Sequence, residues 1–172
     1  EIVAAMEMSL DITNVKILEE QLAKAEKKYH AIFHNIPNPV FVLDAETFEI
    51  LNCNDSVKSV YGYTKDELKQ SSFLNLFKEQ EKETYKAFLN TQRVIDRVAH
   101  MGKDEKPIFV NINIAESEYL GHKALLVTTS DITQRLETEQ QLIQASKMAT
   151  LGEMATGVAH ELNQPLSVIK TG

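Results

Sequence analysis

Apolar side chains recur in steps of three and four between residues 14 and 36. The positions are Val15, Leu18, Leu22, Ala25, Tyr29, Ile32 and Ile36. This spacing places one apolar stripe along a helix and is typical of a coiled-coil seam. Pro37 and Pro39 end the pattern, because a proline ring cannot continue a helix. We therefore predict a linker helix over residues 14–35, and packing on its own domain stays an alternative for the last turn.

The pattern changes to that of a small α+β domain over residues 36–133. Short runs at 40–43 and 48–52 predict two strands, and the Thr-Lys-Asp-Glu sequence at 64–67 is a capping box that opens a helix. A longer helix is expected over residues 79–93. The order of elements, two strands, small helices and then three more strands, predicts a five-stranded antiparallel sheet with short helices.

The last three strands have their own pattern. Apolar and polar residues alternate with a period of two, as in a half-buried strand. The alternating positions are Ile108, Val110, Asn111, Ile112, Asn113 and Ile114. Gly102 and Gly121 mark the two turns, so these strands form a meander.

An internal repeat links the two ends of this domain. Residues 10–22 read LDITNVKILEEQL and residues 130–142 read SDITQRLETEQQL, 120 positions later. In each copy a strand-like stretch precedes Asp-Ile-Thr. It covers residues 4–9 in the first copy and residues 124–130 in the second. We interpret residues 1–13 as the last strand of a preceding domain of the same kind, with chance similarity as the alternative.

Composition excludes some partners. The net charge of −7 and the pI near 5.3 argue against a nucleic-acid surface. Cys53 is the single cysteine, so no intramolecular disulfide forms, and a cytoplasmic location fits. No apolar run approaches the roughly 20 residues of a membrane helix. The chain lacks an initiator Met and stops within a helical pattern, so we expect a longer protein, at a membrane only if anchored upstream.

Four short motifs in residues 36–133 carry a resemblance. Asn52, Val60-Tyr61-Gly62-Tyr63 and Asp66-Glu67-Leu68 resemble the Asn…Gly-Tyr…Glu-Leu signature of PAS domains, and Asp131-Ile132-Thr133 resembles their Asp-x-Thr exit motif. A departure lies at residues 101–105, where the family often has a basic residue followed by Asp-Gly. The resemblance implies a sensor domain.

Residues 148–166 form the second resemblance. Met148, Leu151, Ala155, Val158 and Leu162 keep helical spacing. The His160-Glu161-Leu-Asn-Gln-Pro-Leu run resembles the H box of sensor histidine kinases, especially the subclass whose H box has this sequence. It implies that a ring nitrogen of His160 attacks the γ-phosphate of ATP, while Glu161 accepts the other ring proton. Without the full motif, a surface histidine on a structural helix would be favoured.

The rest of that motif and the helix before it add three expectations. Pro165 predicts a bend one turn beyond His160. Gln164 stands where many histidine kinases have Thr or Asn to orient water, so phosphatase activity is expected to be weak or differently organised. Asp131 or Thr133 can cap the outgoing helix and so make a fixed joint for signal relay.

The apolar seam of the outgoing helix is imperfect. Leu136 and Ile143 are seven apart, but the next heptad place is Thr150 and the stripe resumes at Leu151. Residues 134–172 are thus interpreted as a signalling helix and the truncated first helix of the dimerisation and phosphotransfer domain, with a one-residue slip that could hold two packings close in energy.

Other chemistries fit less well. A zinc protease helix needs His-Glu-x-x-His, and the fifth position is Gln164. His30 and His34 have metal-ligand spacing but fit better as polar residues near a helix C-terminus, so no metal site is predicted. Cys53 precedes the Gly-Tyr element, unlike the flavin-linked cysteine of photosensory PAS domains. No histidine lies between residues 35 and 99, so neither flavin nor haem is expected.

The resemblances together predict one function. The chain is a fragment of a two-component sensor histidine kinase, a homodimer whose PAS domain senses or relays and whose His160 passes phosphate to a response-regulator aspartate. ATP would be held by the kinase's own ATP-binding domain, which is absent from this sequence, so the fragment alone should be inactive. The alternatives are a non-enzymatic PAS dimerisation module and a small-molecule binding module.

Overall fold

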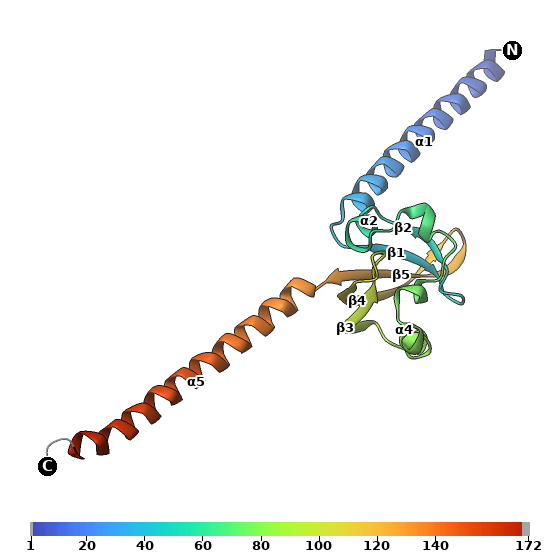
Figure 1. Cartoon of the computed structure of the whole chain (residues 1–172). Coiled ribbons are helices and arrows are strands. Elements are labelled where there is room, and N and C mark those ends of the chain that lie inside the picture. Colours follow the sequence, from blue (N-terminus) through green and yellow to red (C-terminus); the bar gives the residue numbers. More distant parts are fainter. Residues whose placement is uncertain (1, 170–172) are drawn as a thin grey trace. The chain divides into compact units, whose positions relative to one another are not determined.

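The computed structural model describes residues 2–169, except the side chains of residues 4–11 and 163–169. Along the chain, one long helix precedes a small α+β domain and a second long helix follows it (Figure 1). The helices are α1 (Ile2–Asn35), α2 (Ser56–Tyr61), α3 (Lys65–Leu68), η1 (Phe73–Leu76), η2 (Glu79–Glu81), α4 (Lys82–Thr91) and α5 (Thr133–Ile169). The strands are β1 (Val40–Asp44), β2 (Ile50–Cys53), β3 (Val94–Met101), β4 (Pro107–Tyr119) and β5 (His122–Asp131).

The five strands form one antiparallel sheet in the order β2-β1-β5-β4-β3. The predicted fold class is therefore confirmed, as is the meander of the last three strands. The last strand lies in the middle, where Phe41 of β1 pairs with Val127 and Ile114 of β4 pairs with the same residue from the other side. This central position brings the two ends of the domain together, and the Thr129 amide donates to the Pro39 carbonyl at 2.9 Å.

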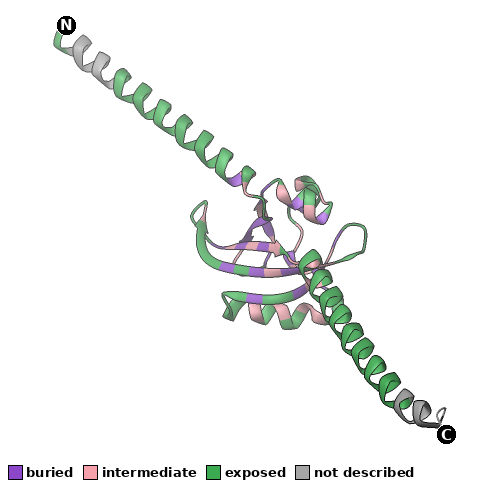
Figure 2. Cartoon of the chain, turned by 90° about the vertical axis from the view of Figure 1, so that its left-hand side faces the viewer, coloured by how far each residue is buried: buried purple, intermediate pink, exposed green. Residues whose placement is uncertain are grey.

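The hydrophobic core lies between one face of the sheet and the short helices. Alternate strand residues are buried, as Figure 2 shows by the alternating colours along the strands. Val110 and Ile112 on β4 are fully buried, and Leu89 of α4 and Phe73 of η1 join the same cluster. The period of two seen in the sequence is thus the period of core contacts.

Local signals fix the helices that cover this core. The capping box is present, with the Thr64 hydroxyl accepting from the Glu67 amide and the Glu67 carboxylate accepting from the Thr64 amide at 2.9 Å. Gly62 ends α2 in the left-handed region, at φ 79°, which glycine adopts without strain. The helix predicted over residues 79–93 is shorter and divided into η2 and α4.

The segment before the linker helix differs from the prediction. Residues 2–13 belong to α1, so the strand expected over residues 4–9 is wrong. A strand needs a neighbour for its backbone hydrogen bonds, and none of the sheet strands in the described part of the chain pairs with this segment. Ala, Met, Glu and Leu dominate it and favour a helix instead. The kinship of residues 1–13 with a preceding domain stays a prediction.

Candidate phosphoacceptor helix and sensor core

His160 and Glu161 lie on α5, and both side chains are exposed. No hydrogen bond or ion pair reaches either of them from the side chains that the structure describes. Neighbouring positions on a helix point about 100° apart, so they do not face each other. The His160 ring is thus exposed and is not oriented by Glu161 in this structure.

An apolar stripe on the same helix is left exposed by the other described residues of that helix. Leu151, Met154, Val158 and Leu162 are 55–67% exposed. Beyond its first turn, α5 has the colour of exposed residues as far as its side chains are described (Figure 2). Such a stripe is favourable only when another surface buries it, because apolar area in water costs free energy.

The end of the motif lies partly outside the described residues. The side chains of Gln164 and Pro165 are among those not described, while the helical backbone continues through both to Ile169. The bend at Pro165 and the role of Gln164 stay predictions.

The joint between domain and helix is one residue long. β5 ends at Asp131, α5 begins at Thr133, and the Leu136 amide donates to the Ile132 carbonyl at 3.0 Å. Ile132 is thus the residue whose carbonyl accepts the first helical bond, which defines the N-cap position. Capping by Asp131 or Thr133 stays a prediction.

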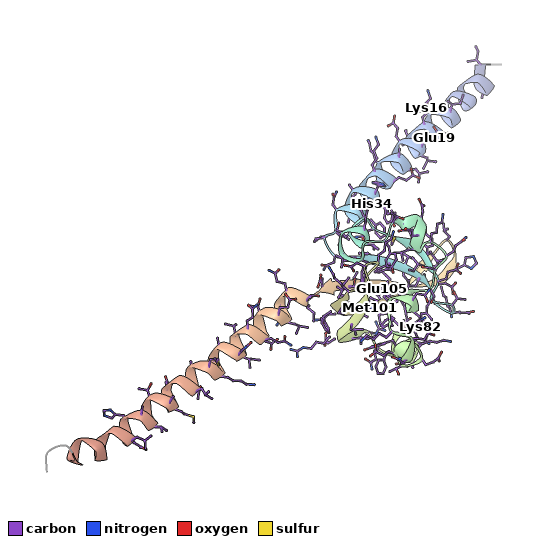
Figure 3. All side chains as sticks on the ribbon, viewed as in Figure 1. Lys16, Glu19, His34, Lys82, Met101 and Glu105 are labelled. Carbon is purple, nitrogen blue, oxygen red and sulfur yellow. The ribbon has the colours of Figure 1, made fainter. Side chains whose placement is uncertain are left out.

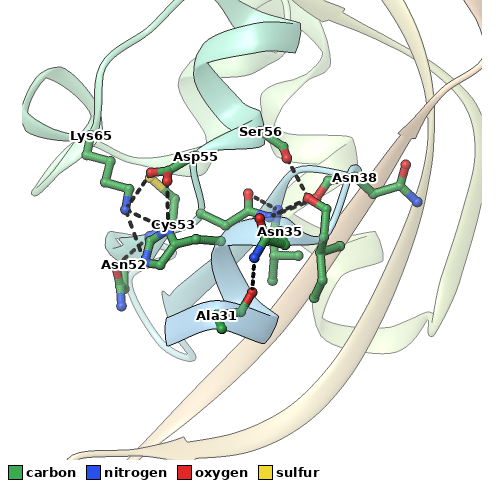
Figure 4. Close-up of polar contacts among 12 residues, drawn as sticks. Ala31, Asn35, Asn38, Asn52, Cys53, Asp55, Ser56 and Lys65 are labelled. Atoms are coloured by element: carbon green, nitrogen blue, oxygen red, sulfur yellow. Dashed lines mark hydrogen bonds and ion pairs between the residues drawn. The ribbon is translucent and has the colours of Figure 1, made fainter. Parts of the chain in front are cut away.

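A buried asparagine organises the other end of the domain (Figure 4). Asn54 is fully buried; its Oδ1 accepts from the Val40 amide at 3.0 Å and its Nδ2 donates to the Asn38 carbonyl at 3.0 Å. The Ser56 hydroxyl and Asn54 Nδ2 both donate to the Ile36 carbonyl, at 2.5 and 3.3 Å. These bonds fix the backbone conformation of the segment between α1 and β1.

The asparagine named in the sequence signature, Asn52, lies two residues earlier, in β2. Asn52 only accepts from the next amide, of Cys53, at 2.9 Å. Asp55 holds the N-cap position of α2, but its side chain makes no capping bond. The missed signal was that Asn54 is the polar residue that follows β2, where a backbone clasp is needed.

Asp55 instead binds His34 and Lys65. Its carboxylate lies 2.9 Å from Lys65 Nζ and 3.2 Å from His34 Nδ1, and the bond to Lys65 is the main cause that lowers the pKa of Asp55. His34 lies at the end of α1 that meets the domain (Figure 3). Phe33 beside it is buried, so the last turn of α1 does pack on the domain.

Lys65 Nζ also lies 3.1 Å from the same ring nitrogen of His34. One nitrogen cannot donate to Asp55 and accept from Lys65 at once, so the two contacts are alternatives. Within the described residues, no group of three metal-ligating side chains gathers here or elsewhere.

Sequence reasoning missed a polar cluster in the core. His100 and Thr129 are fully buried and Tyr61 is 2% exposed; Tyr61 Oη lies 2.8 Å from His100 Nδ1 and donates to Thr129 Oγ1 at 3.1 Å. Burial lowers the pKa of His100 to about 3 and raises that of Tyr61 well above its ordinary value. The signal was available, because His100 follows Val98 at the strand period of two.

A hollow of about 460 Å³ opens beside the end of α4. Its lining includes the buried Leu89, Ile114 and Leu125 and also the charged residues Arg93 and Lys123. It can receive a small molecule with both apolar and polar parts.

Neither long helix carries, in its described residues, an apolar stretch sufficient to cross a lipid bilayer.

Comparison with known proteins agrees with this architecture. Residues 37–134 match the model of a PAS domain family. The sensor histidine kinase TmoS of Ectopseudomonas mendocina is 28% identical over 87% of this chain and 17% of its own length. The signal transduction histidine-protein kinase AtoS of Escherichia coli is 28% identical over 95% of this chain and 28% of its own. The chain thus spans under a third of these relatives.

Among solved structures, the PAS domain of an HTR-like protein from Haloarcula marismortui has the same fold. Its TM-score is 0.58, with 21% identity over 68% of this chain and 99% of that chain.

Proposed function

Because the chain belongs to the PAS domain family, we propose that it is the sensing and relay part of a two-component sensor histidine kinase and that His160 is its phosphoacceptor. Its relatives TmoS and AtoS are histidine kinases. The observation that carries the proposal is an exposed His160, within the full His-Glu-Leu-Asn-Gln-Pro-Leu run, on the helix that leaves the PAS domain.

The reaction follows from the position of His160. A ring nitrogen with a free lone pair attacks the γ-phosphorus of ATP, the nitrogen–phosphorus bond forms, and the bond to the ADP oxygen breaks. Glu161 starts about 100° around the helix from His160, so its side chain has to turn toward the ring; it then takes the proton of the other ring nitrogen and so raises the nucleophilicity of the ring. The protein mainly has to position the groups and stabilise charge. The phosphoryl group then passes to an aspartate of a response regulator.

The reaction needs further components. The kinase's own ATP-binding domain brings ATP to His160, and a second copy of the chain covers the exposed stripes. In α1 these are Val15, Leu18, Leu22, Tyr29 and Ile32, which are 49–63% exposed. A long helix with an uncovered stripe is marginal in water, so a parallel homodimer, acting in the cytoplasm, is the proposed state.

Phosphorylation of this chain by a supplied ATP-binding domain of the same kinase tests the proposal. With radiolabelled ATP, the chain should gain an acid-labile label, as a phosphoramidate does. His160→Gln should abolish the label, and Glu161→Gln should slow it. His122→Gln removes another exposed histidine, on β5, and is the matched control. A label that survives His160→Gln would sink the assignment.

A second function is favoured by the hollow beside α4: the PAS domain binds a small molecule. This function is compatible with the first and supplies its stimulus. The same labelling assay distinguishes a kinase fragment from a ligand-binding or dimerisation module without kinase activity. Such a module would gain no label.

A further inference from the structure

Three polar side chains in the core form one continuous hydrogen-bonded chain. Tyr61 comes from α2, His100 from β3 and Thr129 from β5, so the chain joins three elements that are far apart in sequence. The central oxygen, Tyr61 Oη, touches both of the others. Because water is excluded, each bond depends on what the next group donates or accepts.

The phenol has one proton, which couples the two bonds. When Tyr61 donates to Thr129, as the geometry has it, His100 must donate from Nδ1, and Nε2 carries a lone pair. When Tyr61 donates to His100 Nδ1, the ring carries its proton on Nε2, and the Thr129 hydroxyl donates to Tyr61. Both arrangements hold the same number of protons.

His100 Nε2 has no hydrogen-bond partner among the described groups. Its surroundings are aromatic: the Phe77 ring meets the imidazole edge-on, with centroids 4.5 Å apart and planes at 79°. A ring face attracts an N–H and a ring edge attracts a lone pair, so a change of tautomer is linked to the way Phe77 packs on the imidazole. Phe77 in turn stacks on Tyr85 of α4, which is half-buried, so the aromatic contacts lead to the surface.

Thr129, at the other end of this series of hydrogen bonds, lies near both termini of the PAS domain. The Thr129 amide bonds Pro39, just before β1, and Asp131 ends β5 two residues later. The negative charge of Asp131 also contributes, after burial, to raising the pKa of Tyr61. A change in the hydrogen bonding of Thr129 therefore occurs where the polypeptide both begins and leaves the sheet.

We propose that Tyr61, His100 and Thr129 form a two-state relay in which the tautomer of His100 changes together with the donor role of Tyr61. Displacement of Phe77 and Tyr85 admits water, the ring loses its Nδ1 proton to this water and gains one at Nε2, and Thr129 changes from acceptor to donor. The relay thereby connects the helical cover of the core to the joint at Asp131. Its effect on kinase output rests on the proposed function.

Nitrogen NMR of the chain with ¹⁵N-labelled histidine tests the relay, because protonated and bare ring nitrogens have separate shifts. The parent should have His100 protonated at Nδ1. Thr129→Val keeps the shape but removes the acceptor of the Tyr61 proton, so His100 should change to the Nε2–H tautomer. Thr128→Val, on the other face of β5, is the matched control and should leave the parent tautomer.

An identical tautomer in the parent and in Thr129→Val would overturn the relay. Should Thr129→Val fail to fold, Tyr61→Phe replaces it. This variant removes the hydroxyl that joins His100 to Thr129, and His100 that stays entirely in the Nδ1–H form would contradict the proposal.

In the full-length kinase, Thr129→Val should change autophosphorylation at least threefold while Thr128→Val does not. An unchanged rate would overturn the connection to output. A parent without autophosphorylation would instead refute the proposed function, and the NMR result would still decide the relay.

Discussion

The helix α5 and the core of the PAS domain each hold a histidine in opposite surroundings. His160 is exposed on α5, whereas His100 is fully buried with one nitrogen bonded to Tyr61. Burial keeps His100 neutral, with its pKa lowered to about 3, because an imidazolium ion among aromatic rings has no water or counterion to stabilise it. A phosphoacceptor needs access for a second domain, while the proposed relay keeps one state as long as water is excluded and changes state when water enters.

Substitutions in the two regions should also have different effects, on activity in α5 and on stability in the core. Side chains on the exposed helix make few contacts within the chain, so their replacement should change activity and leave the stability of the PAS domain as it is. Side chains in the core make many contacts, so their replacement should change stability first.

The largest effect is expected for Phe73→Ala. Phe73 is fully buried and packs against Phe41, Phe77 and His100. Loss of the ring should lower the free energy of unfolding by about 3–5 kcal/mol. Urea denaturation measures this change. His160→Gln is the comparison, and we expect it to stay within about 0.5 kcal/mol of the parent. Equal losses in both variants would remove the contrast between the two regions.

Stability should next depend on pH through His100. Its pKa is near the model-compound value of 6.5 in the unfolded chain and about 3 in the folded one. The unfolded state therefore binds more protons between these values, and stability falls as the pH decreases below 6.5, by at most about 1.4 kcal/mol per pH unit.

Urea denaturation at about pH 5 and about pH 6.5 isolates this effect, because most carboxylates titrate lower. Glu67, for example, has its pKa lowered to about 2, chiefly by Lys103. His100→Phe should lose most of the difference in stability between the two pH values. A difference as large as in the parent would show that another group titrates.

Asn54→Ala should lower the stability of the domain less than Phe73→Ala does, but more than Asn52→Ala does. It leaves the Val40 amide and the Asn38 carbonyl without their present side-chain bonds. An orphaned buried group costs about 1–3 kcal/mol. Asn52→Ala, which loses one local bond, is the matched control and should cost under about 0.5 kcal/mol. Thermal unfolding ranks the two; equal costs would contradict the clasp.

Asp131→Ala should leave the domain folded but uncouple it from output. The residue ends β5 at the one-residue joint, so its loss should affect transmission more than packing. Deletion of one residue between Ile143 and Met148 should fix output high or low, because it changes the phase of the two halves of the α5 seam. Autophosphorylation of the full-length kinase with and without stimulus measures both, and responses like the parent's would make the joint merely structural.

The smallest effect is expected for Gln164→Ala. If regulator dephosphorylation is weak in the parent, this variant should change it little. The measurement is release of phosphate from a phosphorylated response regulator. Strong dephosphorylation that is lost in Gln164→Ala would show that the longer amide orients water as well as Thr or Asn does.

Two kinds of residue were predictable from sequence by itself. The capping box at Thr64 and the alternation of Val110 and Ile112 are local, because their partners lie within four residues or on the same strand face. The motif around His160 is also a local pattern, and the structure confirms only that His160 is exposed on a helix; its chemistry stays a prediction. Local patterns of period two or 3.6 contain this information directly.

Contacts between distant residues were decided by the tertiary structure. Tyr61 meets His100 and Thr129 across 39 and 68 positions, and Asn54 rather than Asn52 became the clasp because it faces residues 36–40. The helical state of residues 4–9 was likewise a matter of neighbours, since a strand-like pattern forms a strand only where another strand supplies hydrogen bonds. A buried polar group is placed by partners that the chain brings together only when it folds, so its role has no local pattern to reveal it.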